Sequence, residues 1–295
     1  MDIDFLLWLQ NLREATGNVF TPFMVLMSNL AIYLLLPVFL YWCISKRGGL
    51  LLMLSLYLGS FAYNILKLTF CIARPFVRDA RIVPLHKESG YSFPSGHAAI
   101  SSSVFGSIAV LTRKKSALFS WICGAVIALV ALSRMYHGVH TPQDVIAGIA
   151  TGLLCVWAAS VLIERENVMT VLLPVICAAG LAYTSIRSCC DDSTPFVSVA
   201  RWTFFYGGTL FGFVAGHYVE RKYINFHATG LNLKGIALGV IGCVVYYLAD
   251  FVYLRSFIAA AAPFITSEGA YFAAGFVLTF YAVALWPLVI KKVCE

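Results

Sequence analysis

The side chains that could perform chemistry gather between residues 67 and 144 of an otherwise apolar chain. This stretch holds two histidines, one carboxylate and three cations in three clusters. The clusters are Lys67 with Arg74-Pro75, then Pro94-Ser95-Gly96-His97, then Ser133-Arg134 with His140 and Asp144. Ionisable groups are costly close to lipid, so their presence in such a chain predicts a functional site.

The three cations suit a phosphate group as their ligand. A phosphoryl group in transfer spreads negative charge over three oxygens, and fixed cations and N–H donors stabilise that charge. Lys67 supplies a point charge, whereas Arg74 and Arg134 each present a fork of N–H donors that fits two phosphate oxygens.

The second cluster opens an apolar run that predicts a helix over residues 98–112. Ser95 can cap this helix, and Gly96 lets the backbone approach a ligand closely. The free N–H groups at the start of a helix bind anions. We therefore expect Ser95, Gly96 and His97 to lie against the phosphate.

The third cluster could supply a nucleophile. His140 precedes Thr141-Pro142-Gln143-Asp144, a sequence typical of an N-cap, a proline at the first helical position and an acid in the first turn. Asp144 lies one helical turn beyond His140. Its carboxylate can accept a hydrogen bond from one ring nitrogen and hold the other nitrogen in its reactive tautomer.

Together the three clusters resemble the signature of the type 2 phosphatidic acid phosphatase superfamily. Residue types and spacings match at every defining position, over about a quarter of the chain. The resemblance implies that His140 attacks phosphorus to form a phosphohistidine. It also implies that His97 protonates the leaving oxygen and then activates water.

The same resemblance implies a site that needs no metal and no other cofactor. The charge on the phosphate oxygens would be stabilised instead by the cations and by the backbone of the second cluster, which are Lys67, Arg74, Arg134, Ser95 and Gly96. Each cluster taken alone has an ordinary interpretation. A single Lys, Arg or His at a membrane edge often snorkels or caps a helix, and Asp144 alone would complement a helix dipole.

The loop between the first two clusters carries further cations, Arg78, Arg81 and Lys87. These side chains could recognise a second phosphate or a lipid head group. We prefer the simpler interpretation of a solvated loop with aromatic residues at the membrane interface. His137, between the residues of the third cluster, could line the pocket, although a structural role is favoured.

Composition indicates a polytopic membrane protein. The chain has 295 residues, of which 60% are hydrophobic and 12% are charged, whereas about a quarter of the residues in a soluble domain are charged. The net charge of +7 is not gathered into a patch, so we expect no nucleic-acid partner. No cysteine spacing predicts a zinc site.

Nine apolar runs approach the length of about 20 residues that a spanning helix needs. They lie at roughly 20–44, 48–66, 97–112, 117–135, 142–163, 169–186, 198–219, 235–254 and 271–290. We therefore predict an all-α, polytopic membrane helix bundle. The resemblance implies a core of about six helices, and further C-terminal helices would bring the total to about nine spans.

We divide the chain into three parts. Residues 1–19 form an interfacial N-terminal segment, because positions 2–16 alternate between apolar and polar side chains at helical spacing. Residues 20–186 form the catalytic membrane core, and residues 187–295 form C-terminal transmembrane helices. Glycines four residues apart, such as Gly148 with Gly152, predict close helix packing within the bundle first and a homodimer second.

Loop charges predict the orientation. The face away from the clusters carries Lys46, Arg47, Arg113, Lys114, Lys115, Arg165, Arg221, Lys222, Lys234, Lys291 and Lys292. Outside the clusters, the other face carries Arg13, Arg78, Arg81, Lys87, Arg187, Arg201 and Arg255. Because cations favour the cytoplasm, we expect a bacterial cytoplasmic-membrane protein whose active site opens to the extracytoplasmic face.

These observations predict a membrane phosphatase that removes the terminal phosphate of a lipid phosphate or diphosphate. Candidate substrates are undecaprenyl diphosphate, phosphatidylglycerol phosphate, phosphatidic acid and sphingoid-base phosphates. A site at the membrane edge favours a lipid that enters from the bilayer. Two alternatives stay open: a soluble sugar phosphate, because nine spans are similar to glucose-6-phosphatases, and a phospholipid transporter or scramblase that uses the cations only for binding.

Overall fold

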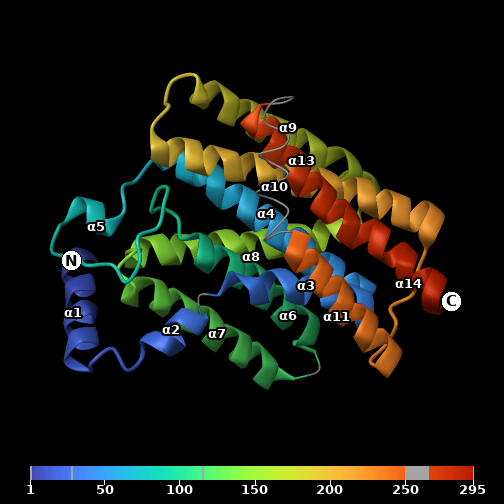
Figure 1. The fold of residues 1–295 in the computed structure, drawn as a ribbon, viewed down its shortest axis with the longest axis horizontal. Helices are drawn as coiled ribbons and strands as arrows, with labels where there is room; N and C mark the ends of the chain where they lie inside the picture. The colour runs from blue at the N-terminus through green and yellow to red at the C-terminus, as the bar shows by residue number, and fades with distance from the viewer. Residues whose placement is uncertain (1, 28, 115, 250–265, 295) are drawn as a thin grey trace.

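The computed structural model describes residues 2–27, 29–114, 116–249 and 266–294. Every regular element in these ranges is helical (Figure 1), which confirms the predicted all-α bundle. Lys115 and Arg255, two of the loop cations in the orientation argument, lie outside the described residues, as do residues 250–254 of the eighth apolar run.

The helices follow the predicted apolar runs with one exception. In chain order they are α1 (Asp2–Ala15), α2 (Thr21–Met27), α3 (Leu30–Cys43), α4 (Lys46–Phe70), α5 (Pro75–Arg78), α6 (Gly96–Thr112), α7 (Ala117–Tyr136), α8 (Pro142–Glu164), α9 (Glu166–Ser188), α10 (Thr194–Val219) with the π-helical turn η1 (Glu220–Ile224), α11 (Leu233–Leu248), and α13 (Ser267–Phe280) continued by η3 (Tyr281–Leu285) and α14 (Trp286–Cys294). The prediction of a single helix over 20–44 is wrong, because α2 and α3 divide that run.

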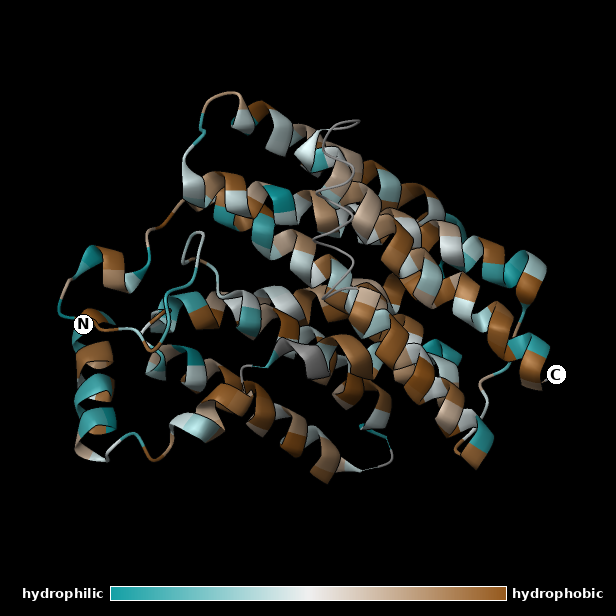
Figure 2. Cartoon of the chain, in the orientation of Figure 1, coloured by the Kyte–Doolittle hydropathy of each residue, from teal (hydrophilic) through white to brown (hydrophobic). Residues whose placement is uncertain are grey.

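Hydrophobic residues predominate along most of the helices (Figure 2), and many large apolar side chains are exposed on the outside of the bundle. Trp121, Trp157 and Val171 are all more than 60% exposed, an arrangement that suits contact with lipid. Within the described residues, five helical segments are long and apolar enough to cross a membrane: 46–78, 117–136, 142–164, 166–188 and 267–294. The prediction of about nine spans is therefore not confirmed.

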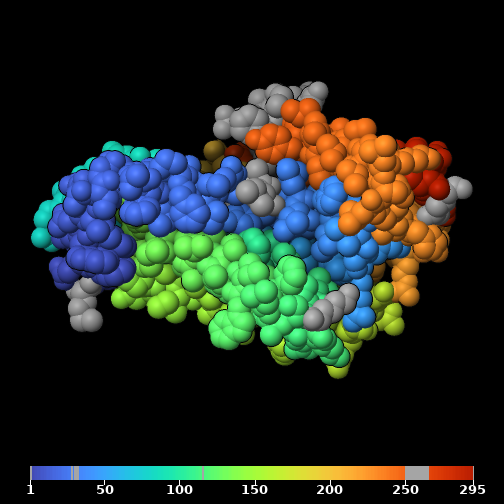
Figure 3. All heavy atoms as spheres, turned by 90° about the horizontal axis from the view of Figure 1, so that it is seen from below, coloured from blue at the N-terminus to red at the C-terminus, as the bar shows by residue number. Residues whose placement is uncertain are grey.

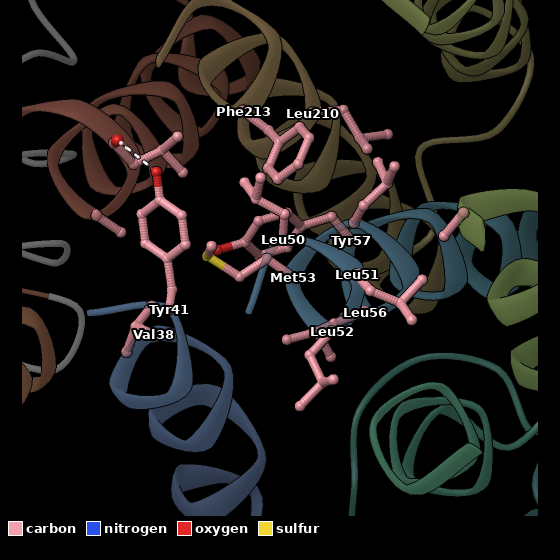
Figure 4. Close-up of a cluster of buried hydrophobic side chains, with 14 of the residues drawn as sticks. Val38, Tyr41, Leu50, Leu51, Leu52, Met53, Leu56, Tyr57, Leu210 and Phe213 are labelled. Atoms are coloured by element: carbon pink, nitrogen blue, oxygen red, sulfur yellow. Dashed lines mark hydrogen bonds between the residues drawn. The ribbon is translucent and has the colours of Figure 1, made fainter. Parts of the chain in front are cut away.

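Helix α4 runs through the centre and packs against α3, α6, α8 and α10. It begins where the side chain of Ser45 accepts a hydrogen bond from the Gly48 N–H at 3.1 Å. Figure 4 shows α4 residues 50–57 meeting Tyr41 of α3 and Phe213 of α10. The Tyr41 hydroxyl donates to the Val283 carbonyl at 3.3 Å. This packing fixes the position of α4, and with it Lys46 at its start and Lys67 near its end.

Helices α6 and α8 approach each other at the level of their backbones. A Cβ atom on Gly148 would overlap the Ser95 carbonyl oxygen, and one on Gly152 would overlap the Ala99 carbonyl oxygen. These two glycines therefore serve packing within the bundle, which was the first of the two interpretations. A homodimer remains a prediction.

The N-terminal helix α1 lies beside α7, and Figure 3 shows α1 and α2 along one face of the molecule next to α7. Its Arg13 is buried rather than solvated. The guanidinium group donates to the Val83 carbonyl at 3.0 Å and to the Tyr136 carbonyl at 3.3 Å. The helix predicted for residues 2–16 is confirmed, and its location at a membrane interface remains a prediction.

Candidate active site

The predicted site residues come together at one end of the bundle. The C-terminal ends of α4 and α7 meet the N-terminal ends of α6, α8 and α10 there, at the left of Figure 1. A cavity of about 280 Å³ opens between them. Five of the eight predicted catalytic and phosphate-binding residues line it: Lys67, Arg74, Gly96, His97 and His140. Asp144, Ser95 and Arg134 lie buried behind this lining.

His140 is positioned by the start of α8. The predicted cap is confirmed: Thr141 caps the helix, Pro142 follows, and the Asp144 side chain accepts from the Thr141 N–H at 2.7 Å. This capping box holds the Asp144 carboxylate below the His140 ring. Nδ1 of His140 lies 3.6 Å from Oδ2 of Asp144, which is too long for a direct hydrogen bond.

Ser92 fills the space beside this pair, and sequence reasoning missed it. Its buried hydroxyl donates to Oδ2 of Asp144 at 2.6 Å and lies 3.5 Å from Nδ1 of His140. Ser92 lies in the loop before α6, whereas the other two residues belong to the third cluster. The hydroxyl therefore ties the loop of the second cluster to the acid that stands behind His140.

Arg74 is held by the loop that covers the cavity. It donates to the carbonyl groups of Ser89 at 2.9 Å, Gly90 at 3.2 Å and Val139 at 3.3 Å. One terminal nitrogen also lies 3.3 Å from Nε2 of His140. The guanidinium group is thus fixed beside the ring nitrogen that faces the cavity.

Glu88 joins the two arginines, and it was not predicted as a site residue. Its carboxylate pairs with Arg134 through one oxygen and lies 3.3 Å from Arg74 through the other. The Nε of Arg134 has no hydrogen-bond partner in the described part of the chain. Two arginines thus share one carboxylate, which lies between them.

Two ionisable groups that line this cavity, Glu88 and His140, have lowered pKa values. Burial alone would raise the pKa of Glu88, but the positive charges of Arg134, His97 and Arg74 outweigh it and hold that pKa below its usual range. Burial, together with the charges of Arg74 and Lys67, lowers the pKa of His140 well below 6.5. At neutral pH, Glu88 is therefore ionised and the His140 imidazole is neutral.

The first two clusters differ from expectation in one respect. Lys67, near the end of α4, donates to the carbonyl groups of Tyr91 and Ser92, the latter at 3.3 Å. Ser95 occupies the N-cap position of α6, yet its hydroxyl makes no capping bond, so the predicted cap is wrong. Its N–H donates to the Asp144 carbonyl at 2.8 Å. The N–H donors left for a ligand are therefore those of Gly96 and the residues that follow.

Helix α10 supplies a wall of the cavity that sequence reasoning did not anticipate. Ser198, Trp202 and Tyr206 line it together with Tyr63 of α4. The spacing of four residues along α10 is the signal that could have revealed this stripe. The predicted boundary at residue 186, between the catalytic core and the C-terminal helices, therefore separates residues that line the same cavity.

The four side chains suggested for substrate recognition do not line this cavity. Arg78 pairs with Asp2 at 3.2 Å, and Arg81 pairs with Asp79 at 2.7 Å. Lys87 is exposed. His137 is buried, with Nδ1 against the Ser133 carbonyl and its ring 5.2 Å from that of His86.

Comparisons with known proteins agree with this geometry. The chain is 35% identical over 141 residues to an undecaprenyl-diphosphatase of Sulfolobus acidocaldarius, a match that covers 46% of this chain and 65% of the relative. It is 39% identical over 79 residues to phosphatidylglycerophosphatase B of Bacillus subtilis, covering 24% and 38% of the two chains. This chain thus spans less than two thirds of the length of either relative.

The crystal structure of Aquifex aeolicus LpxE aligns with a TM-score of 0.46 and 24% identity, over 54% of this chain and 93% of that one. Residues 48–168 match the PAP2 superfamily. The apolar helices and the membrane-type relatives identify an integral membrane protein. The matched segment contains all three clusters, so the part of the chain that forms this site is similar to the PAP2 superfamily.

Proposed function

We propose that this protein is a membrane phosphatase that hydrolyses the terminal phosphate of a lipid phosphate or diphosphate through a phosphohistidine intermediate. One observation carries the proposal. The buried His140 presents Nε2 to a cavity lined by cations, while Asp144 and Ser92 lie against its Nδ1. A site that only bound phosphate would not need a histidine supported in this way.

The reaction follows from this arrangement. With its proton on Nδ1, His140 uses the Nε2 lone pair to attack phosphorus, and the bond from phosphorus to the leaving oxygen breaks as the N–P bond forms. His97 gives a proton to the leaving oxygen. It then takes a proton from water, which attacks the phosphohistidine and releases phosphate.

The cations stabilise both steps. Lys67, Arg74 and Arg134 surround the place where charge develops, and they are held by backbone carbonyl groups and by Glu88 before the substrate arrives. Arg74 points at Nε2 of His140 in the resting site, so we expect an arriving phosphate to draw this guanidinium group onto its own oxygens. No metal enters this scheme.

A lipid substrate is favoured by the place of the cavity at the end of apolar helices. Relatives bear the names undecaprenyl-diphosphatase, phosphatidylglycerophosphatase B, lipid A 4'-phosphatase and sphingosine-1-phosphate phosphatase 2. We include α10 in the catalytic unit with the core at residues 20–186, because its side chains line the cavity. Loop cations favour a site on the extracytoplasmic face of a bacterial cytoplasmic membrane.

The test is phosphate release by the detergent-solubilised protein. The panel comprises lipid monophosphates, lipid diphosphates and glucose 6-phosphate, each with and without EDTA and beside His140→Ala. Release from lipids that survives EDTA and disappears in the variant is expected. Release from glucose 6-phosphate alone would move the assignment to a sugar phosphatase, and phosphate-lipid binding without release would favour a transport role.

A further inference from the structure

A second cavity adjoins the catalytic one. It has a volume of about 300 Å³ and lies on the other side of Ser198 and Trp202, which line both cavities. Its remaining lining comes from Asp192, Thr194, Val197, Arg201 and Tyr271. The two cavities are therefore neighbours that share lining residues on α10.

Arg201 is the cation of this second cavity. It lies on α10 as a half-buried side chain, and its Nε, which is buried, has no hydrogen-bond partner in the described ranges. Asp192 lines the same cavity, but it is exposed and forms no ion pair with Arg201 among the described residues. A buried N–H without an acceptor is costly, and an anionic ligand in this cavity would supply the acceptor that Nε lacks.

The spacing along α10 places Arg201 close to a residue that lines both cavities. Ser198 and Arg201 are three residues apart, so their Cβ atoms lie about 5–6 Å from each other on one face of the helix. Ser198 also contacts the loop before α6 that covers the catalytic cavity, because its hydroxyl donates to the hydroxyl of Ser89 at 3.3 Å. Arg201 therefore lies about one helical turn from the wall of the cavity that contains His140.

We propose that the second cavity binds a second phosphate group of the substrate, with Arg201 as its ligand, while the terminal phosphate is transferred at His140. This inference rests on the proposed phosphatase function and narrows the substrate to a lipid diphosphate. The guanidinium fork matches two oxygens of the phosphate that stays on the lipid.

Arg201 would thus hold the leaving group. As the N–P bond forms at His140, the bond from the terminal phosphorus to the bridging oxygen breaks, and His97 protonates that oxygen. The lipid monophosphate that results keeps its remaining phosphate on Arg201. Water then cleaves the phosphohistidine as in the general scheme.

The test compares two substrates with the same lipid tail, farnesyl diphosphate and farnesyl phosphate. Arg201→Gln should lower kcat/KM for the diphosphate about 10- to 100-fold, the size expected for losing hydrogen bonds to a charged group. Turnover of the monophosphate should change by less than about 2-fold. Arg201→Lys should recover part of the loss, because it restores the charge without the fork.

Arg187→Gln is the matched control. Arg187 is a cation on the same side of the molecule, but it contacts the Phe196 ring and Cys71 and lines neither cavity. It should leave both substrates unaffected. An equal loss on both substrates in Arg201→Gln, or no loss on either, would overturn the proposed subsite.

A failure of the phosphatase function itself would give a different result. In that case the wild-type protein would release phosphate from neither substrate. The subsite is then tested by binding of inorganic diphosphate and orthophosphate, measured as a rise in melting temperature. Arg201→Gln should weaken binding of the diphosphate alone, and identical binding by the two proteins would refute the subsite.

Discussion

Helix α4 connects two ends of the bundle that both bury charged side chains. At the end opposite the catalytic cavity, each acid has its own cation. Lys46 pairs with the buried Glu220 at 2.8 Å, and the other pairs are Arg47 with Glu164 and Arg221 with Glu166. At the catalytic end, three cations, Lys67, Arg74 and Arg134, face two carboxylates, Glu88 and Asp144.

The presence of a cavity does not distinguish these two ends, because both contain one. The opposite end contains one of about 350 Å³, lined by its own charged residues. The difference lies in the charge around each cavity. Three cations match three acids in the lining of the cavity at the opposite end, whereas three cations face two carboxylates around the catalytic cavity. We infer that unbalanced charge, held by backbone carbonyl groups, distinguishes a phosphate site from a structural ion-pair cluster.

The largest expected effect comes from removing a cation of the unbalanced end. Arg134→Gln should lower kcat/KM for phosphate release about 10²- to 10³-fold, as for the loss of one donor to a developing oxyanion. Arg221→Gln removes a cation of the balanced end and should leave turnover unchanged. Melting temperatures would show that both variants fold, and equal losses in the two would break the comparison.

Breaking a pair at the balanced end should cost stability instead of turnover. Lys46→Met leaves Glu220, only 1% exposed, without its cation, and we expect destabilisation of roughly 3 kcal/mol. The double variant Lys46→Met/Glu220→Gln should recover much of this loss, because no charge is then left unpaired. Denaturation measures both, and a fall in kcat of the folded protein would contradict the assignment.

Ser92→Ala tests the hydroxyl beside His140. Loss of a hydrogen bond to the Asp144 carboxylate should lower kcat about 10-fold with little change in KM. Ser107 provides the control, because its hydroxyl is equally buried but lies away from the site. That hydroxyl donates to the Ser103 carbonyl at 2.7 Å. Ser107→Ala should lower the melting temperature alone, and the same kcat loss in both variants would remove the special role of Ser92.

The displaced pKa values predict a pH dependence. Because the pKa of Glu88 is lowered in the folded protein, its stabilising effect is complete above the unfolded value of about 4.3 and is lost as the pH falls below it. The difference in melting temperature between the wild type and Glu88→Gln should be constant from pH 5 to pH 8 and shrink towards pH 3.

Because the pKa of His140 is lowered as well, its protonation should not limit turnover near pH 6.5. The acid limb of kcat/KM should therefore lie below that value. A limb at pH 6.5 or above would mean that burial and the neighbouring cations do not lower the pKa of this imidazole.

The smallest effect should come from Arg47→Gln. Both members of the Arg47–Glu164 pair are more than half exposed, and exposed pairs contribute only about 0–1 kcal/mol. Neither turnover nor the free energy of unfolding should change measurably. A large loss would mean that this pair belongs to the same cooperative network as Glu220.

The local part of this site could be predicted from the sequence, and the long-range part could not. The cap that positions Asp144 and the helix that begins after Ser95 depend on neighbouring residues, so their spacing reveals them. Glu88 and Ser92 reach the site because the loop before α6 folds back over it, and no local pattern specifies that path. Trp202 enters through packing of α10 on α4, which hydropathy cannot predict.

The same limit explains the two errors. Ser95 has the residue type of a cap, but its N–H is held by the Asp144 carbonyl of another helix. The run at 20–44 is apolar throughout, so hydropathy alone gives no sign that it forms two helices. A tertiary contact explains the first error, and a break between α2 and α3 explains the second.

The contact of Gly148 and Gly152 with the backbone of α6 has a consequence for how such sites could be built. His97 lies in the first turn of α6, and His140 lies two residues before the start of α8. The two glycines fix the register of these helices, so we expect neither histidine to shift along its axis without the other. The pair α6–α8 therefore behaves as a single transplantable unit. If α6 and α8 are moved together into another helical bundle, the distance between the two histidines should be preserved. The cations and the α10 side chains that line the cavity would then have to be designed.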